Sequence, residues 1–79
     1  MKPVKRSLSR TQRQYLDLLL NLPDGVPTDT FLECHGWTRS GANLVAQHIV
    51  NLRRKVEGQY VIEAIHGFGY QMFPVEPKI

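Results

Sequence analysis

The sequence predicts a single, mainly α-helical domain in which three helices are followed by a β-hairpin. The chain has 79 residues, which is enough for one hydrophobic core and too few for two. Apolar residues recur at helical spacing in the first two thirds of the chain. The last third holds two short β-branched and aromatic segments that are separated by glycines. These three observations together define the expected fold class.

The first helix is predicted to run from about Arg10 to Leu22. Ser9 is followed three residues later by Gln12, which is a capping-box pattern at a helix start. The apolar residues that follow at helical spacing are Tyr15, Leu16, Leu19, Leu20 and Leu22. The segment 23–25, Pro-Asp-Gly, ends this helix because proline cannot continue the hydrogen-bond ladder and Asp-Gly favours a turn.

Two further helices are predicted before the hairpin. Thr28 can cap a short second helix, which Gly36 is placed to end. Residues 38–41 form a polar link, and a third helix starts at Gly41 or Ala42 and ends before Gly58. The third helix carries a single apolar stripe, which consists of Val45, Ile49, Leu52 and Val56.

The hairpin is predicted from a strand at 60–65, a turn at 66–69 and a returning strand at 70–73 that Pro74 ends. We expect Trp37, Tyr70 and Phe73 to close the core between the hairpin and the helices, with Phe68 either in this core or exposed. A short second helix, a longer third helix and a terminal hairpin are the parts of a winged helix-turn-helix. The domain is therefore assigned to residues 9–73, between a basic lead at 1–8 and a flexible tail at 74–79.

Charge and motifs narrow the class of function. The net charge is only +3, but residues 1–13 contain five basic residues and no acid, and Arg53-Arg54-Lys55 form a second cluster. Two basic patches favour a nucleic acid as partner, although ordinary solvated helix faces also carry Lys and Arg. Neither a secretory leader nor an apolar segment of about 20 residues is present, so we expect a cytoplasmic protein.

Enzyme chemistry is not expected from this sequence. The chain has no phosphate-binding GxxxxGK[ST] loop, no HExxH pair and no suitably spaced pair of carboxylates. Its single cysteine, Cys34, leaves no disulfide framework and too few soft ligands for structural zinc. We therefore expect a binding protein that is not an enzyme, with no cofactor and no metal.

The face of the third helix opposite its apolar stripe is the candidate for reading DNA bases. This face consists of Asn43, Gln47, Val50, Asn51 and Arg54. Asn and Gln can form two hydrogen bonds with adenine, which makes Asn43, Gln47 and Asn51 candidates for base contacts in the major groove. The alternative is a solvated helix face without such a role.

Other residues are candidates for the DNA backbone or a groove edge. Arg53, Arg54 and Lys55 end the third helix, where they either contact phosphates or only complement the helix dipole. Arg39 and Ser40 precede the first amides of that helix, a favourable place for an anion. His66 lies at the hairpin tip and either contacts a groove or is a plain exposed turn residue. His48, on the helix flank, is expected to be a packing residue.

The segments 52–56, Leu-Arg-Arg-Lys-Val, and 65–70, Ile-His-Gly-Phe-Gly-Tyr, resemble the end of an OmpR/PhoB-type output domain. The resemblance covers residues 8–73 and includes Leu32, Trp37, Val45 and Ile49. It implies that the third helix binds in the DNA major groove and the wing in the minor groove.

The sequence also differs from the family pattern in several places, and each difference changes what we expect of the protein. The family has an amino-terminal β-sheet and usually a receiver domain before the first helix. Because eight residues precede Ser9, we expect a stand-alone miniature without either and without aspartate-phosphate control. The link that in the family can contact RNA polymerase is short here, at 38–42. The family's reading positions correspond to Gln47, Asn51, Ala64 and His66, and arginine is usual where Asn51 and His66 stand.

The expected function is sequence-specific regulation of transcription on double-stranded DNA, with a recognition helix at about 41–56 and a wing at about 61–73. The resemblance is to small regulators of phages or mobile elements, and a monomer or weak dimer that associates on DNA is expected. One alternative is a protein-binding winged helix that targets RNA polymerase or another regulator, which the low net charge and Val50 favour. The other is an architectural or recombination DNA-binding factor.

Overall fold

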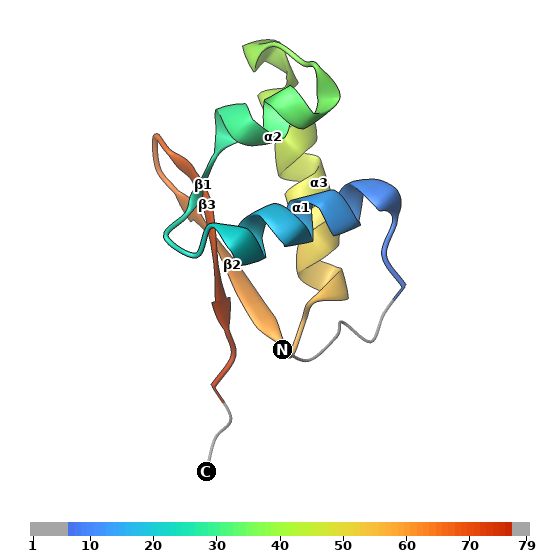
Figure 1. The fold of residues 1–79 in the computed structure, drawn as a ribbon, viewed down its shortest axis with the longest axis vertical. Coiled ribbons are helices and arrows are strands. Elements are labelled where there is room, and N and C mark those ends of the chain that lie inside the picture. The colour runs from blue at the N-terminus through green and yellow to red at the C-terminus, as the bar shows by residue number, and fades with distance from the viewer. Residues whose placement is uncertain (1–6, 77–79) are drawn as a thin grey trace.

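The computed structural model describes residues 7–76, and it has the predicted order of three helices and a hairpin (Figure 1). Most of the predicted basic lead, residues 1–6, and the end of the predicted tail, 77–79, lie outside the described residues. The elements in chain order are α1 (Arg10–Asn21), β1 (Val26–Pro27), α2 (Thr28–His35), the 3-10 helix η1 (Arg39–Gly41), α3 (Ala42–Lys55), β2 (Tyr60–Ile65) and β3 (Gly69–Pro74).

The strands form a three-stranded antiparallel sheet with the order β1-β3-β2. The hairpin of β2 and β3, with the turn 66–68 between them, is called the wing below. The sequence predicted only these two strands, and β1 was missed. It is two residues long, and it pairs Val26 with Tyr70 and Pro27 with Gly69. A strand this short has no periodicity of its own, so only the distant wing defines it.

The ends of α1 and α2 follow from local side-chain and backbone chemistry. In α1, the Ser9 hydroxyl accepts from the Gln12 amide and the Gln12 side chain accepts from the Ser9 amide, which confirms the predicted capping box. Helix α2 ends as predicted at Gly36, which is in the left-handed conformation with φ 67°. Its start was predicted wrongly, because Pro27 occupies the N-cap position and Thr28 is the first helical residue, without a capping hydrogen bond.

The core lies between the three helices and the inner face of the sheet. All four residues of the predicted α3 stripe are fully buried, and the remaining buried apolar residues come from α1, β1, α2 and the two wing strands: Tyr15, Leu16, Leu19, Val26, Phe31, Leu32, Ile62 and Met72. Helix α3 packs against both α1 and α2 (Figure 1). The stripe therefore determines which face of α3 remains available to a partner.

The aromatic residues divide between the core and the surface. Trp37 and Tyr70 are partly buried and pack against the core, as expected. Phe73 was predicted to be inside but is 38% exposed, because it pairs with Val61 on the outer face of the wing while its neighbour Met72 points inward. Phe68, for which the sequence left both positions open, is also exposed.

The wing extends slightly further than the sequence predicted. Pro74 pairs with Tyr60 inside β3, and the Val75 amide donates to the Gln59 carbonyl at 3.0 Å. Residues 74 and 75, which were assigned to the tail, thus continue the pairing of the wing in this structure.

Candidate nucleic-acid interface

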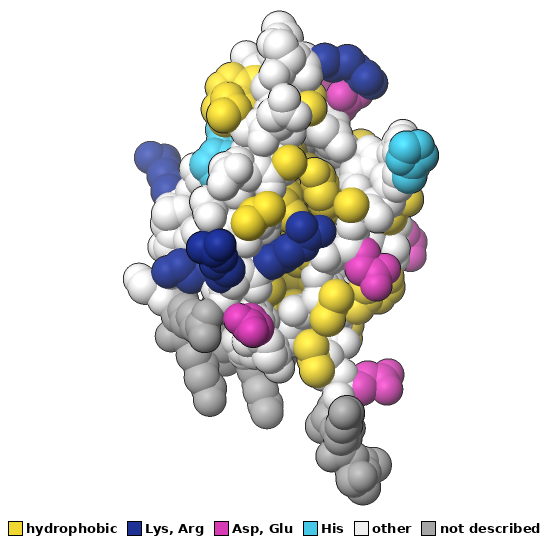
Figure 2. Space-filling view, turned by 180° about the vertical axis from the view of Figure 1, so that it is seen from behind, with side chains coloured by type: hydrophobic (Ala, Val, Ile, Leu, Met, Phe, Trp, Pro, Cys, Tyr) yellow, Lys and Arg dark blue, Asp and Glu magenta, His cyan; other side chains and the backbone are white. Residues whose placement is uncertain are grey.

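The outward face of α3 is exposed along its whole length. Asn43, Gln47, Val50, Asn51 and Arg54 are all exposed, opposite the buried stripe. Figure 2 shows the molecule from the side opposite to Figure 1, where Lys and Arg side chains are mixed with apolar ones and several Asp and Glu side chains lie on the same face. The sequence prediction of which α3 residues face solvent is therefore confirmed.

The last turn of α3 is tied to the wing by Arg53. Its Nε donates to the Ile62 carbonyl in β2 at 3.0 Å, so part of this guanidinium is used inside the protein. Arg54 is exposed on the outward face, and Lys55 is half-buried. The three basic residues that the sequence grouped together therefore differ in position. Of the three, Arg54 lies on the outward face of α3.

The wing tip is held next to the start of α2. The turn is closed by a hydrogen bond of 3.0 Å from the Phe68 amide to the Ile65 carbonyl, and Gly67 takes a positive φ of 74° within it. The Thr28 amide at the start of α2 donates to the Phe68 carbonyl at 3.0 Å. His66 is exposed in this turn, so its backbone position is set relative to α2 as well as to the wing.

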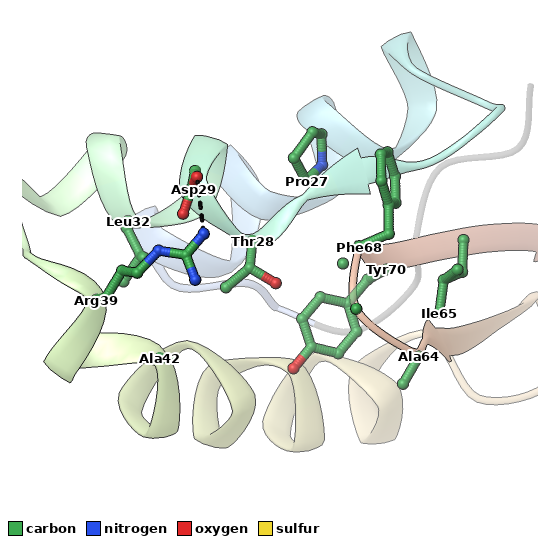
Figure 3. Close-up of a pocket in the computed structure, with 12 residues that line it drawn as sticks. Pro27, Thr28, Asp29, Leu32, Arg39, Ala42, Ala64, Ile65, Phe68 and Tyr70 are labelled. Atoms are coloured by element: carbon green, nitrogen blue, oxygen red, sulfur yellow. Dashed lines mark ion pairs between the residues drawn. The ribbon is translucent and has the colours of Figure 1, made fainter.

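A hollow of about 500 Å³ separates the wing from η1 and the starts of α2 and α3. Figure 3 shows Arg39 and Asp29 on one side of it, and Ala64, Ile65 and Phe68 of the wing on the other. Arg39 and Asp29 form an ion pair of 3.5 Å between exposed side chains. The acid was missed by the sequence analysis, because residues ten apart on two different helices share no spacing rule.

Ser40 follows Arg39 in η1. Its hydroxyl lies 2.8 Å from that of Thr38, and the two share a hydrogen bond. Both residues are exposed. Of the two predicted backbone-contact residues before α3, Arg39 is therefore paired with an acid and Ser40 with a neighbouring hydroxyl.

A cluster of four rings, which the sequence analysis did not assemble, joins the three helices. The Tyr15 hydroxyl of α1 lies 2.7 Å from Nε2 of His35 in α2, and the His35 ring stacks on Trp37 with centroids 3.8 Å apart. His48 of α3 stacks on His35 and Trp37, with centroids 5.4 Å and 6.1 Å away, and meets the Tyr15 ring edge-on. His48 is half-buried, in agreement with the predicted packing role.

The surroundings of this cluster shift two of its pKa values. Burial lowers the pKa of His35, and the neighbouring His48 lowers it further. Burial raises the pKa of Tyr15 to about 12, with smaller contributions from Cys34 and Tyr70. In the neutral His35 ring, the Tyr15 hydroxyl donates to Nε2 if the ring proton is on Nδ1, and it accepts from Nε2 if the proton is there. The folded environment thus favours the neutral forms of His35 and Tyr15.

We expect the domain to lose stability as the pH falls below about 6.5, the ordinary pKa of histidine. The folded state has the lower His35 pKa, so the unfolded chain takes up this proton first, and the stabilisation present above pH 6.5 declines toward the folded pKa. Urea unfolding at about pH 7.5 and about pH 5.5 measures this difference. His35→Gln should reduce the pH dependence of the free energy of unfolding, whereas His66→Gln should leave this dependence intact. If wild type and His35→Gln show the same pH dependence, it does not arise from His35.

Other classes of site are not found in the part of the chain that the structure describes. Within residues 7–76, no group of three or more His, Cys, Asp or Glu residues is arranged to hold a metal ion. No helix within this range is both long enough and apolar enough to cross a membrane.

Comparison with known proteins gives one match. The model of the family described as "Transcriptional regulatory protein, C terminal" matches residues 4–72, which is most of the chain. No curated protein and no solved structure matches it. The matched range contains all three helices and nearly all of the wing. The chain belongs to this family, the OmpR/PhoB-type DNA-binding domains of transcriptional regulators, and it has their winged-helix fold.

Proposed function

We propose that this protein is a sequence-specific regulator that binds double-stranded DNA, with α3 in the major groove and the wing in the minor groove. The observation that carries the proposal is the outward face of α3. It is exposed from its first turn to its last, and it bears amide and guanidinium groups that match base edges. A regulator of this kind acts in the cytoplasm, where its DNA is.

Asn43, Gln47 and Asn51 are the proposed base-reading residues. They lie four residues apart, so they form one line that extends about 12 Å along the helix axis. At about 3.4 Å per base pair, this line spans three to four base pairs. Each amide can recognise adenine through its N6 and N7 atoms. We therefore expect a short, adenine-containing half-site.

The proposed phosphate contacts surround this line. Arg54 lies on the outward face, and Arg53 and Lys55 lie at the same helix end. Arg39 and Ser40 lie in η1 just before α3, and His66 lies in the turn of the wing. A DNA backbone that passes between α3 and the wing would meet groups on both sides. These contacts provide affinity without sequence preference.

The proposal is tested by selection of bound duplexes from random-sequence DNA, followed by binding measurements on the selected sequence. We expect Gln47→Ala and Asn51→Ala to reduce discrimination between this sequence and others. Arg54→Ala should weaken binding to all sequences and lower the salt slope by about one. Gln14→Ala, an exposed substitution in α1, is the matched control. Unchanged binding in all three variants would exclude α3 as the recognition helix.

We expect Asp29→Asn to strengthen DNA binding by about two- to fivefold at low salt. Asp29 places a negative charge beside the hollow and pairs with Arg39, so its neutralisation removes a repulsion from phosphate and releases a cation. Fluorescence anisotropy with a labelled duplex measures the change. Asp17→Asn removes the same charge from an exposed position on α1 and should have a smaller effect. Equal gains in the two variants would show only the change in net charge.

A second candidate function is recognition of a protein such as RNA polymerase. The observation that favours it is the presence of two exposed apolar residues on α3, Leu44 at 53% and Val50 at 38%. Salt dependence distinguishes the candidates, because binding to phosphates weakens steeply with salt. Salt-sensitive binding without an enriched motif would instead favour an architectural or recombination factor.

We expect the protein to be a monomer or a weak dimer that associates on DNA. The large apolar residues that are exposed in the described chain belong to several elements: α3, the wing, the segment after β3 and the end of α1. A stable dimer needs a continuous interface of roughly 1,200 Å² or more. Sedimentation with and without the selected duplex measures this property.

A further inference from the structure

Val50 is the one apolar side chain among the outward residues of α3, and the proposed function does not yet give it a role. It is 38% exposed and lies one helical turn from both Gln47 and Arg54. Ala46, one turn before Val50, is half-buried, and Ala42, a further turn before, lines the hollow opposite Ala64 of the wing. Ala42, Ala46 and Val50 therefore form a strip of small and apolar side chains along α3, and Ala42 at its start faces the hollow.

This strip lies in the middle of the proposed DNA-binding face. Figure 2 shows apolar side chains mixed with the Lys and Arg side chains of this side of the molecule. Phosphate and most base-edge atoms are polar, so an apolar strip gains nothing from contact with them. Among the groups that a major groove presents, the C5 methyl of thymine is the apolar one.

We propose that Val50 is a specificity-determining residue that contacts the C5 methyl of a thymine. This inference rests on the proposed function, because it requires α3 in the major groove. The neighbouring Gln47 and Asn51 carry amides suited to adenine, and every adenine has a thymine as its partner on the other strand. A valine beside adenine-reading amides therefore meets a methyl group either within the same base pair or at the adjacent step.

The contact predicts a measurable preference. Burial of one methyl group against Val50 corresponds to about a fourfold change in affinity. Val50→Ala removes the two Val50 methyl groups that make the contact. Since Val50 is exposed and outside the core, this substitution should leave the fold intact, and a melting curve checks that it does.

The experiment uses the duplex selected by the wild-type protein, in which each thymine is replaced in turn by deoxyuridine, which lacks only the methyl group. We expect one such replacement to weaken wild-type binding about fourfold and to have little effect on Val50→Ala. Val50→Thr, which keeps one methyl group at the same shape, should show an intermediate loss. Leu44→Ala removes an exposed apolar side chain from another side of α3 and should keep the full wild-type sensitivity.

Two results would overturn the inference while the proposed function stands: wild-type binding that is indifferent to every deoxyuridine, or equal sensitivity in wild type and Val50→Ala. If the wild-type protein enriches no sequence from random DNA, the proposed function itself fails and the role of Val50 fails with it. The selection step thus separates the two failures.

Discussion

Gly69→Ala should destabilise the domain by about 3 kcal/mol or more, which is a large part of the stability of a chain of this size. Gly69 is buried where β3 passes β1. A Cβ at this position would collide with the Val26 carbonyl oxygen and would lie 2.8 Å from the Thr28 nitrogen. All of these are backbone atoms, so relief requires separation of β1 from β3 and loss of their hydrogen bonds.

Gly67→Ala is the matched control for this prediction. Gly67 lies in the same hairpin with a positive φ of 74°, but a Cβ there would have nothing within 4 Å. Its substitution should therefore cost only the strain of a left-handed alanine, about 1 kcal/mol. Urea unfolding of both variants measures the difference. Equal losses would mean that the close approach of β1 and β3 is not what requires glycine at position 69.

Leu52→Ala should lower the free energy of unfolding by about 2 to 5 kcal/mol. Leu52 is fully buried at the centre of the α3 stripe, and its truncation leaves a cavity that the surrounding helices can only partly fill. Val50→Ala, two residues away on the exposed side, should cost less than about 1 kcal/mol. Thermal melting of the two variants tests the orientation of α3, since similar losses would mean that its buried and exposed faces are assigned wrongly.

The parts of the fold that could be predicted are those whose signals are local in the sequence. The capping box at Ser9, the left-handed glycine at Gly36 and the four-residue apolar stripe of α3 all depend on neighbours within one or two helical turns. Because these signals lie within the helices themselves, the sequence predicted the helix bounds within one or two residues.

The features that were missed depend on residues far apart in the chain. Strand β1 exists only because Val26 meets Tyr70, and the Tyr15–His35 hydrogen bond joins residues twenty positions apart. No periodicity within a single segment contains this information. Phe73 was misplaced for a different reason: it lies three residues from Tyr70 in one strand, so the two side chains point to opposite faces and cannot both lie in the core.

The candidate site likewise has features that one segment of the sequence predicts and features that depend on contacts between separate elements. The exposure of Asn43, Gln47 and Asn51 follows directly from the buried stripe, so it could be predicted from α3 alone. The pairing of Arg39 with Asp29 and the use of Arg53 by β2 could not, because both depend on how separate elements are placed. Sequence alone thus identified the candidate cations, and the structure shows that Arg39 and Arg53 have partners within the protein.

The wing is fastened to the helices at both of its ends, by Arg53 to Ile62 near the end of α3 and by Thr28 to Phe68 at the start of α2. The span between the helix and the wing tip is therefore preset before any ligand arrives. Under the proposed function, a duplex whose groove spacing differs from this span must itself twist or bend, and the energy of that deformation depends on its base sequence. The domain would therefore respond to DNA shape, and it would discriminate between DNA sequences that differ at base pairs no side chain touches.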